Sequence, residues 1–166
     1  ENFAVHYGRS RTDPIYSGTY QAGGYTIGYL RIPSFPAGFS ASSLMLRAID
    51  TEIAAFKGST DGLVVDVMRN PGGDTCLTNS ILTRLIPYPF RTIGDSILPN
   101  LDIVDSFRAD YQDALDLGSD EVTLAYLKGF YDDVNTAYHE YRGITGPLPI
   151  CGFSLDLSPV SFAYEK

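Results

Sequence analysis

The chain has 166 residues, of which 44% are hydrophobic and 13% aromatic, and its formal net charge at pH 7 is −8. This composition is typical of a globular domain that buries about two-thirds of its unfolded surface, and it excludes a disordered chain. The acidic balance argues against nucleic acid and anionic lipid as partners, because both require a surface rich in Lys and Arg. No apolar run is long enough for membrane insertion.

The first residues do not resemble a signal peptide. Residues 1–17 are polar and irregular, and two strand-like segments follow, at 18–21 and 25–32. Residues 22–24, Ala-Gly-Gly, favour a hairpin between them. The second strand is expected to end at Pro33, because proline cannot donate to a β-ladder.

The segment 43–57 has the apolar periodicity of a helix. We expect a serine within 40–43 to cap its start and Gly58 to end it. Residues 63–68 are apolar and β-branched, which predicts a strand buried on both faces of a sheet. A crossover of this length predicts that this strand runs parallel to the strand at 25–32 through a right-handed connection. The expected apolar face of the helix consists of Met45, Ile49, Ile53 and Phe56.

The strand at 63–68 runs into Asn-Pro-Gly-Gly at 70–73, and helical spacing of apolar residues follows from Leu77 to Leu85. This second helix is expected to stop near Pro87. A strand, a glycine turn and a helix in succession can point bare backbone N–H groups at a ligand. The turn is therefore a candidate anion or oxyanion site.

Three uses of Gly72 and Gly73 compete. A phosphate cradle is disfavoured, because Asp74 follows directly and the glycine-rich phosphate-loop patterns are absent. A purely structural turn is the simplest interpretation. The third is an oxyanion hole, in which one backbone N–H stabilises the transition state by about 3–4 kcal/mol. That use requires the Asp74 carboxylate to point away, as it would if it capped the following helix.

Residues 104–142 carry two apolar stripes at helical spacing, which predict a helical hairpin inserted into the α/β core. Gly118 and Ser119 are expected to stop the first helix and cap the second, with Asp120 and Glu121 favourable at the start of the second. Glycines and prolines interrupt the tail, 143–166, so we expect at most one short strand there. The stripes are Val104, Phe107, Tyr111 and Leu115, and then Leu127, Phe130 or Tyr131, Val134, Tyr138 and Tyr141.

Two cysteines and two histidines give little sign of a redox or metal site. Cys76 and Cys151 either pair, closing a loop of about 75 residues worth about 4 kcal/mol, or remain two separate buried thiols, which we favour. His6 and His139 have no cysteine or carboxylate at ligand spacing, so we expect no metal and no other cofactor.

Residues 62–73, GLVVDVMRNPGG, resemble the D-[LI]-R-x-N-x-G-G signature of the C-terminal-processing (tail-specific) serine peptidases. Residues 27–35 are similar to the G-Y-[IL]-x-[IL]-x-x-F strand of that family, and the resemblance covers 25–87. Two departures are present: Met68 stands where arginine is usual, and Asp74 stands where an apolar residue is common.

The resemblance implies an α/β fold whose core is an incomplete ClpP/crotonase-like ββα spiral with a helical hairpin insertion. It implies that Gly72 donates its backbone N–H to the oxyanion hole, with Asp66, Asn70 and Gly73 supporting the motif. It also implies a polypeptide substrate and an extracytoplasmic location, periplasmic or secreted.

We accordingly expect 1–166 to be a single partial peptidase domain. Its parts are an N-terminal segment with the start of the hairpin at 1–24, the core with the motif at 25–87, and the helical insertion at 104–142. An incomplete spiral exposes apolar sheet surface, so self-association or pairing with a missing C-terminal segment is expected.

The nucleophile of such a peptidase is not found in this chain. In the family a serine in a turn of small residues follows an apolar strand, and a lysine activates it. No serine after Gly73 fits that context; Ser161 is nearest, two residues before Ala163 in the tail. Lys57 and Lys128 lie on expected helices and are interpreted as solvated. The sequence thus predicts the front part of a serine endopeptidase, inactive by itself.

Two other functions remain open. One is a non-catalytic protein- or peptide-binding module on the same scaffold, with the helical hairpin at 104–142 making a protein contact. The other is a crotonase-type acyl-CoA enzyme, which the net charge of −8 disfavours, because it would require a basic pocket for the nucleotide.

Overall fold

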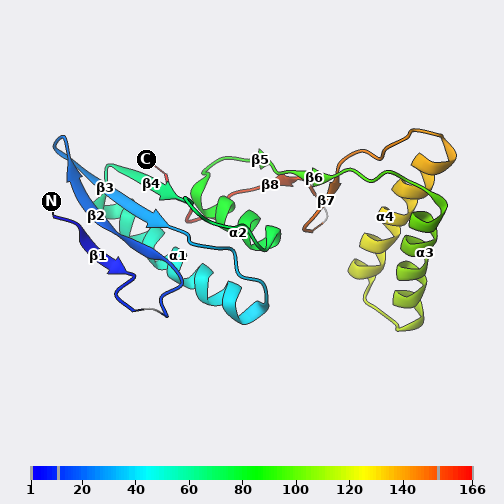
Figure 1. The fold of residues 1–166 in the computed structure, drawn as a ribbon, viewed down its shortest axis with the longest axis horizontal. Coiled ribbons are helices and arrows are strands. Elements are labelled where there is room, and N and C mark those ends of the chain that lie inside the picture. The colour runs from blue at the N-terminus through cyan, green and yellow to red at the C-terminus, as the bar shows by residue number, and fades with distance from the viewer. Residues whose placement is uncertain (1, 11, 153, 166) are drawn as a thin grey trace. The chain divides into compact units, whose positions relative to one another are not determined.

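The structure is a computed structural model that describes residues 2–10, 12–152 and 154–165. It has two compact units: Glu1–Phe90 with Asp156–Lys166, and Arg91–Leu155. The first contains a sheet and two helices, and the second contains a helical hairpin (Figure 1). None of the described helices is long and apolar enough to cross a bilayer.

The sheet of the first unit has four strands in the order β1-β2-β3-β4 (Figure 1). The hairpin between β2 and β3 is confirmed, and Gly23 and Gly24 adopt positive φ angles in its turn. The parallel pairing of β3 with β4 is also confirmed. β1, which pairs antiparallel with β2, lies in the segment that the sequence pattern left irregular. The strands are β1 (Ala4–Tyr7), β2 (Tyr16–Ala22), β3 (Tyr25–Arg31) and β4 (Gly62–Asp66).

Helix α1 (Phe39–Ser59) is longer than expected at both ends. Gly38 occupies the N-cap without a side-chain bond, so the prediction of a serine cap is wrong; Ser42 Oγ instead donates to the Pro36 carbonyl at 3.1 Å. The prediction that Gly58 ends the helix is also wrong. The helix ends at Ser59, and its C-cap is Thr60, whose backbone N–H and hydroxyl both donate to the Phe56 carbonyl, at 3.0 and 2.7 Å.

The main core lies between α1 and the inner face of the sheet. Ile49, Ile53 and Phe56 of α1 are fully buried together with Leu30 of β3. Burying a side chain of this size contributes about 1.5–3 kcal/mol. Gly28 lets the helix approach β3 closely, because a Cβ atom there would lie 3.1 Å from the Phe56 ring.

Strand β4 is the last strand of the described sheet, and the prediction that it is buried on both faces is wrong. Val64 and Val65 are 41% and 39% exposed, and Met68 beyond the strand is 73% exposed. Leu63 packs against the core. An apolar β-branched run indicates a strand but not how many neighbours cover it, and within the described residues β4 pairs only with β3.

Helix α2 (Thr75–Leu85) follows the glycine turn and packs against α1 through buried Leu77 and Ile81. Asp74 is its N-cap, as expected, and the side chain accepts the Leu77 N–H at 3.0 Å. The carboxylate is thereby directed into the helix start.

Asp74→Ala is expected to lower the free energy of unfolding by about 1 kcal/mol, because the N-terminal amides of α2 lose their acceptor. Urea denaturation followed by far-UV circular dichroism measures the change. Asp74→Ser keeps a hydroxyl acceptor and should recover most of the loss; equal losses in both variants would contradict the capping role.

The second unit is built on α3 (Leu101–Asp116) and α4 (Glu121–His139), which confirm the expected helical hairpin. Gly118 follows α3 with a positive φ of 66°, but the N-cap of α4 is Asp120, so the prediction of Ser119 as cap is wrong. Tyr141 lies beyond α4, is 94% exposed, and does not belong to the apolar stripe. The core of the hairpin includes Val104, Val134 and Leu148, with Phe107 and Phe130 against them.

Four short strands complete the description. β6 (Gly94–Asp95) pairs antiparallel with β7 (Leu148–Pro149) in the second unit. β5 (Phe90–Arg91) and β8 (Asp156–Leu157) are also two residues long. Since the tail holds two of these strands, the expectation of at most one is wrong.

Cys76 and Cys151 are each disulfide-bonded. The favoured interpretation of two separate buried thiols is therefore wrong, and Cys76 is in addition exposed.

Candidate functional site

The Asn-Pro-Gly-Gly turn at 70–73 lies where β3 and β4 end. Because these strands are parallel, the segments that follow them meet at the same edge of the sheet. Phe35 after β3 and Gly73 after β4 form an isolated parallel bridge. The Phe35 N–H donates to the Gly72 carbonyl at 3.1 Å, and the Asp74 N–H donates to the Phe35 carbonyl at 2.8 Å. The two loops thus hold each other in register beyond the sheet.

Asp66, the last residue of β4, starts the turn. Its carboxylate accepts the hydroxyl of Tyr29 from β3 and the Met68 N–H, the latter at 2.7 Å. The Tyr29 hydrogen bond and then the Met68 bond lower the pKa of Asp66, and the same hydrogen bond raises the pKa of Tyr29. Asp66 is therefore a carboxylate at neutral pH and clamps the turn to the sheet.

The Asp66 clamp makes stability depend on acid pH in a defined direction. A carboxyl group whose pKa is lower in the folded state stabilises that state above its unfolded pKa, about 3.9, and this stabilisation disappears as the pH falls through the folded pKa. We expect Asp66→Asn to be less stable than the wild type at pH 7, with a difference that shrinks below pH 4. Urea denaturation at pH 7, 5 and 3 measures it, and a difference independent of pH would contradict the clamp.

Asn70 holds the middle of the turn through both ends of its side-chain amide. Nδ2 donates to the Ile32 carbonyl at 3.0 Å, and Oδ1 accepts the Gly72 N–H at 2.7 Å. The preceding Arg69 has a φ of 61°, which for a residue other than glycine costs about 1–3 kcal/mol. The bonds of Asn70 stabilise the turn against this strain.

The two glycines have different roles. Gly72 has a φ of 95° with open space where a Cβ would lie, whereas Gly73 has a φ of 137° and a Cβ there would lie 1.9 Å from the Phe35 carbonyl oxygen. Gly72 is therefore favoured by its conformation, and Gly73 is required by close contact as well.

The two backbone amides also differ. The Gly72 N–H, which the resemblance assigns to an oxyanion hole, is occupied by Asn70. In a parallel bridge of this pattern, the N–H of Gly73 points away from Phe35. Gly73 is exposed, and its N–H has no hydrogen-bond partner in the described part of the chain. The open backbone donor of the motif is thus at Gly73.

The other candidate side chains are engaged elsewhere or exposed. Lys57 Nζ donates to the Ala163 carbonyl at 3.1 Å. Lys128 pairs with Asp132 one turn along α4, and both are exposed. Ser161 is exposed in the tail. No group of three or more His, Cys, Asp or Glu suited to a metal ion occurs among the residues that the structure describes.

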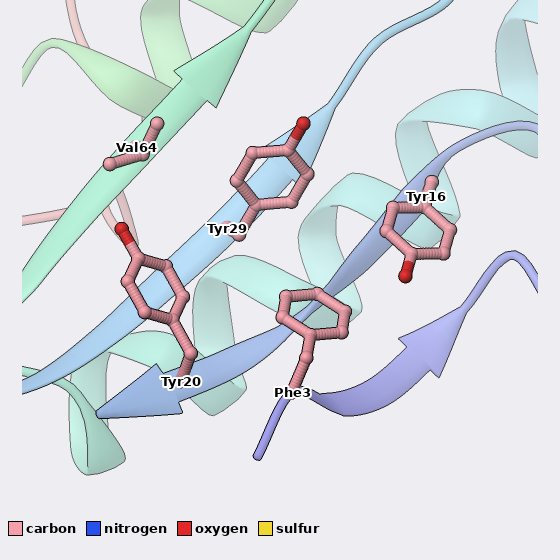
Figure 2. A pocket seen from close by; sticks show the side chains of 5 residues that line it. All are labelled: Phe3, Tyr16, Tyr20, Tyr29 and Val64. Carbon is pink, nitrogen blue, oxygen red and sulfur yellow. The ribbon is translucent and has the colours of Figure 1, made fainter. Parts of the chain in front are cut away.

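Sequence reasoning missed an aromatic pocket on the outer face of the sheet, opposite α1. The pocket has a volume of about 360 Å³ and shares Tyr29 with the Asp66 clamp (Figure 2). The sequence does contain a signal for this pocket. Side chains alternate between the two faces of a strand, so Tyr16, Gly18 and Tyr20 of β2 lie on the same face of the sheet. The lining residues are Phe3, Tyr16, Tyr20, Tyr29 and Val64.

The ring of Phe3 contacts all three tyrosines that line the aromatic pocket (Figure 2). Its ring stacks on Tyr16 at 5.5 Å between centroids and meets Tyr29 edge-on at 5.9 Å. It lies over Gly18, where an added Cβ would be 2.8 Å from the ring. The absence of a side chain at Gly18 therefore makes room for Phe3 on the sheet.

Comparison with protein-family models and with curated proteins finds no match to the chain. Solved structures of CPAF, a chlamydial serine protease, are similar to it. Mature CPAF has a TM-score of 0.66 and 19% identity over 98% of this chain and 35% of its own. Mature CPAF complexed with lactacystin has a TM-score of 0.64 and 19% identity over 92% and 34%. A serine-to-alanine mutant of CPAF has a TM-score of 0.61 and 21% identity over 92% and 33%.

The chain thus spans about one third of the length of the CPAF structures that it matches. At this level of identity the likeness concerns the fold: a mixed α/β arrangement of a sheet and helices similar to part of CPAF.

Proposed function

We propose that this chain is the front part of a serine endopeptidase of the C-terminal-processing (tail-specific) type, with a ClpP/crotonase-like spiral core, acting on polypeptides. The observation that supports this most strongly is the N–H of Gly73, which has no hydrogen-bond partner among the residues that the structure describes. It lies at the carboxyl edge of two parallel strands, in a turn held by the hydrogen bonds of Asn70 and Phe35. We assign the oxyanion-hole role to Gly73 in place of Gly72, whose N–H is bound to Asn70.

The chemistry follows from the position of this donor. When a nucleophile attacks a peptide carbonyl, negative charge develops on the oxygen, and a fixed backbone N–H stabilises it without reorganisation, by about 3–4 kcal/mol per donor. The Asp74 carboxylate would oppose this charge, but it is bound to the Leu77 N–H at the start of α2. Asp66 and Asn70 act as positioning residues that hold the turn.

The nucleophile and its base would come from polypeptide outside this chain. The structural neighbours are longer proteins of which this chain covers 33–35%. The edge of β4 that faces away from β3, which no strand of the described residues covers, is here called the free edge, and a further strand can pair there. The disulfide-bonded state of Cys76 and Cys151 favours an extracytoplasmic compartment, where oxidised cysteines persist.

The test is to produce the chain together with the polypeptide that follows Lys166 in its gene, and to measure hydrolysis of a fluorogenic peptide and labelling by a fluorophosphonate reagent. The extended protein should be labelled and active, and the 166-residue chain should be neither. Turnover by the 166-residue chain that is lost in Ser161→Ala would overturn the assignment of the missing nucleophile. An extended protein without labelling would overturn the peptidase and favour a binding module, for which the aromatic pocket is the relevant surface.

A further inference from the structure

The aromatic pocket and the free edge of β4 are parts of one surface. Val64 of β4 forms one side of the pocket, beside Tyr29 (Figure 2). The Ile32 N–H donates to the Asp66 carbonyl at 2.9 Å, which fixes the alternation of the parallel ladder. Val64 and Asp66 therefore direct their backbone groups to β3, while Leu63 and Val65 direct theirs to the free edge. This edge can accept a strand immediately beside the pocket.

We propose that the aromatic pocket is the socket for one large apolar side chain, carried by a strand that pairs with the free edge of β4 and belongs to the part of the peptidase outside this chain. This inference rests on the proposed function. The length of the structural neighbours points to this occupant, because CPAF, whose fold matches 92–98% of this chain, has only 33–35% of its own length covered by the match. The remaining polypeptide of such a protein is available to complete the sheet.

The geometry of a paired strand places a side chain at the pocket. A residue opposite Val64 would point to the same face of the sheet, with its Cβ about 4.5–5.5 Å away, and diagonal neighbours remain within reach of aromatic side chains. The pocket has a volume of about 360 Å³ and is open to solvent on the outer face of the sheet, so a side chain can enter it from a strand beside β4. Its lining consists of four aromatic rings and Val64, which pack best against another apolar or aromatic group.

Tyr29 connects the socket with the glycine turn. Its ring lines the pocket, and its hydroxyl donates to Asp66, which also accepts the Met68 N–H. A side chain in the socket would restrict the Tyr29 ring and so the Asp66 clamp. Completion of the sheet would thereby order the turn that presents Gly73. Tyr29 is a positioning residue in this scheme.

The experiment titrates the 166-residue chain with overlapping 15-residue peptides that cover the polypeptide encoded after Lys166. Binding is followed by NMR shifts of the Leu63, Val65 and Gly73 amides. One of these peptides should shift the NMR signals of the Leu63 and Val65 amides. Replacing the large apolar residue of that peptide with serine should weaken its binding at least tenfold. Tyr20→Ala should weaken it by a similar factor. Tyr25→Ala is the matched control, since Tyr25 lies on the same face of β3 but does not line the pocket, and it should have no effect.

Tyr29→Phe distinguishes the two roles of Tyr29. The ring that lines the socket remains, and the hydroxyl that connects the socket to Asp66 is lost. The peptide should bind this variant within threefold of wild type, and the shift at Gly73 should disappear while those at Leu63 and Val65 persist. A merely structural role for Tyr29 would change all three shifts together, which would overturn the coupling.

Several results would overturn the socket. The first is that none of the overlapping peptides binds, and the second is that Tyr20→Ala and Tyr25→Ala change the affinity equally. The third is that an unrelated blocked peptide of alternating valine and threonine with a central phenylalanine binds with the same affinity. A dimer of the 166-residue chain that Tyr20→Ala dissociates would make a second copy the occupant and overturn the proposal as well. If the extended protein is active and none of the overlapping peptides binds, the inference fails while the proposed function stands.

Discussion

Gly73→Ala is expected to lower the free energy of unfolding of the sheet-containing unit by about 3 kcal/mol or more. A φ of 137° is accessible to glycine almost alone, and imposing it on alanine costs about 1–3 kcal/mol. The added Cβ would also lie 1.9 Å from the Phe35 oxygen and push the Phe35 segment away. That movement would break the hydrogen bond from the Asp74 N–H to Phe35, which is 2.8 Å long, at a further cost of about 1 kcal/mol.

Two glycine variants serve as controls for Gly73→Ala in the same urea denaturation series. Gly72→Ala meets no atom within 4 Å and should lose only the conformational part, about 1–3 kcal/mol. Gly129→Ala, in the interior of α4 with open space around it, should stabilise the hairpin unit by about 0.4–1 kcal/mol. A loss for Gly73→Ala no larger than that for Gly72→Ala would show that the contact with Phe35 does not constrain the turn. In the extended protein, the proposed oxyanion role of Gly73 predicts that Gly73→Ala reduces kcat/KM at least a hundredfold.

Local sequence signals predicted the elements well where the deciding interaction is local. The glycine pair at 23–24 gave the hairpin, and Asp74 gave the start of α2, because turn geometry and capping depend on a few neighbouring residues. Where a local rule failed, another nearby group took over the role. Asp120 caps α4 in place of Ser119, and its carboxylate accepts both the N–H and the hydroxyl of Thr123.

Features that depend on tertiary pairing were beyond the sequence pattern. The composition of β4 indicates a strand, but the exposure of Val64 and Val65 depends on which other strands are present. Likewise, the direction of the Gly73 N–H follows from the bridge to Phe35, and the Asn70 side chain that binds the Gly72 N–H is itself held by the Ile32 carbonyl; each of these partners lies 38 residues earlier in the chain. The motif indicates the candidate site, and the structure distinguishes the two backbone amides within it.

Hydrogen exchange distinguishes those donors directly in the 166-residue chain. The Gly72 amide should be protected by its 2.7 Å bond to Asn70, and the exposed Gly73 amide should exchange quickly. In Asn70→Ala the Gly72 amide should lose its protection, and the free energy of unfolding should fall by about 2–4 kcal/mol, because two part-buried hydrogen bonds are lost. A Gly72 amide that exchanges as fast as Gly73 in the wild type would contradict this geometry.

Asn70→Asp tests the two bonds of Asn70 separately. A carboxylate can still accept the Gly72 N–H, but it cannot donate to the Ile32 carbonyl and would place an oxygen against it at neutral pH. We therefore expect Gly72 to stay protected at pH 7 while stability falls, and part of the loss to be recovered near pH 3, where the protonated carboxyl can donate. In the extended protein, Asn70→Ala frees the Gly72 N–H, so retained peptidase activity per folded molecule would return the proposed oxyanion role to Gly72. A loss greater than tenfold is expected if Gly73 depends on the turn that Asn70 holds.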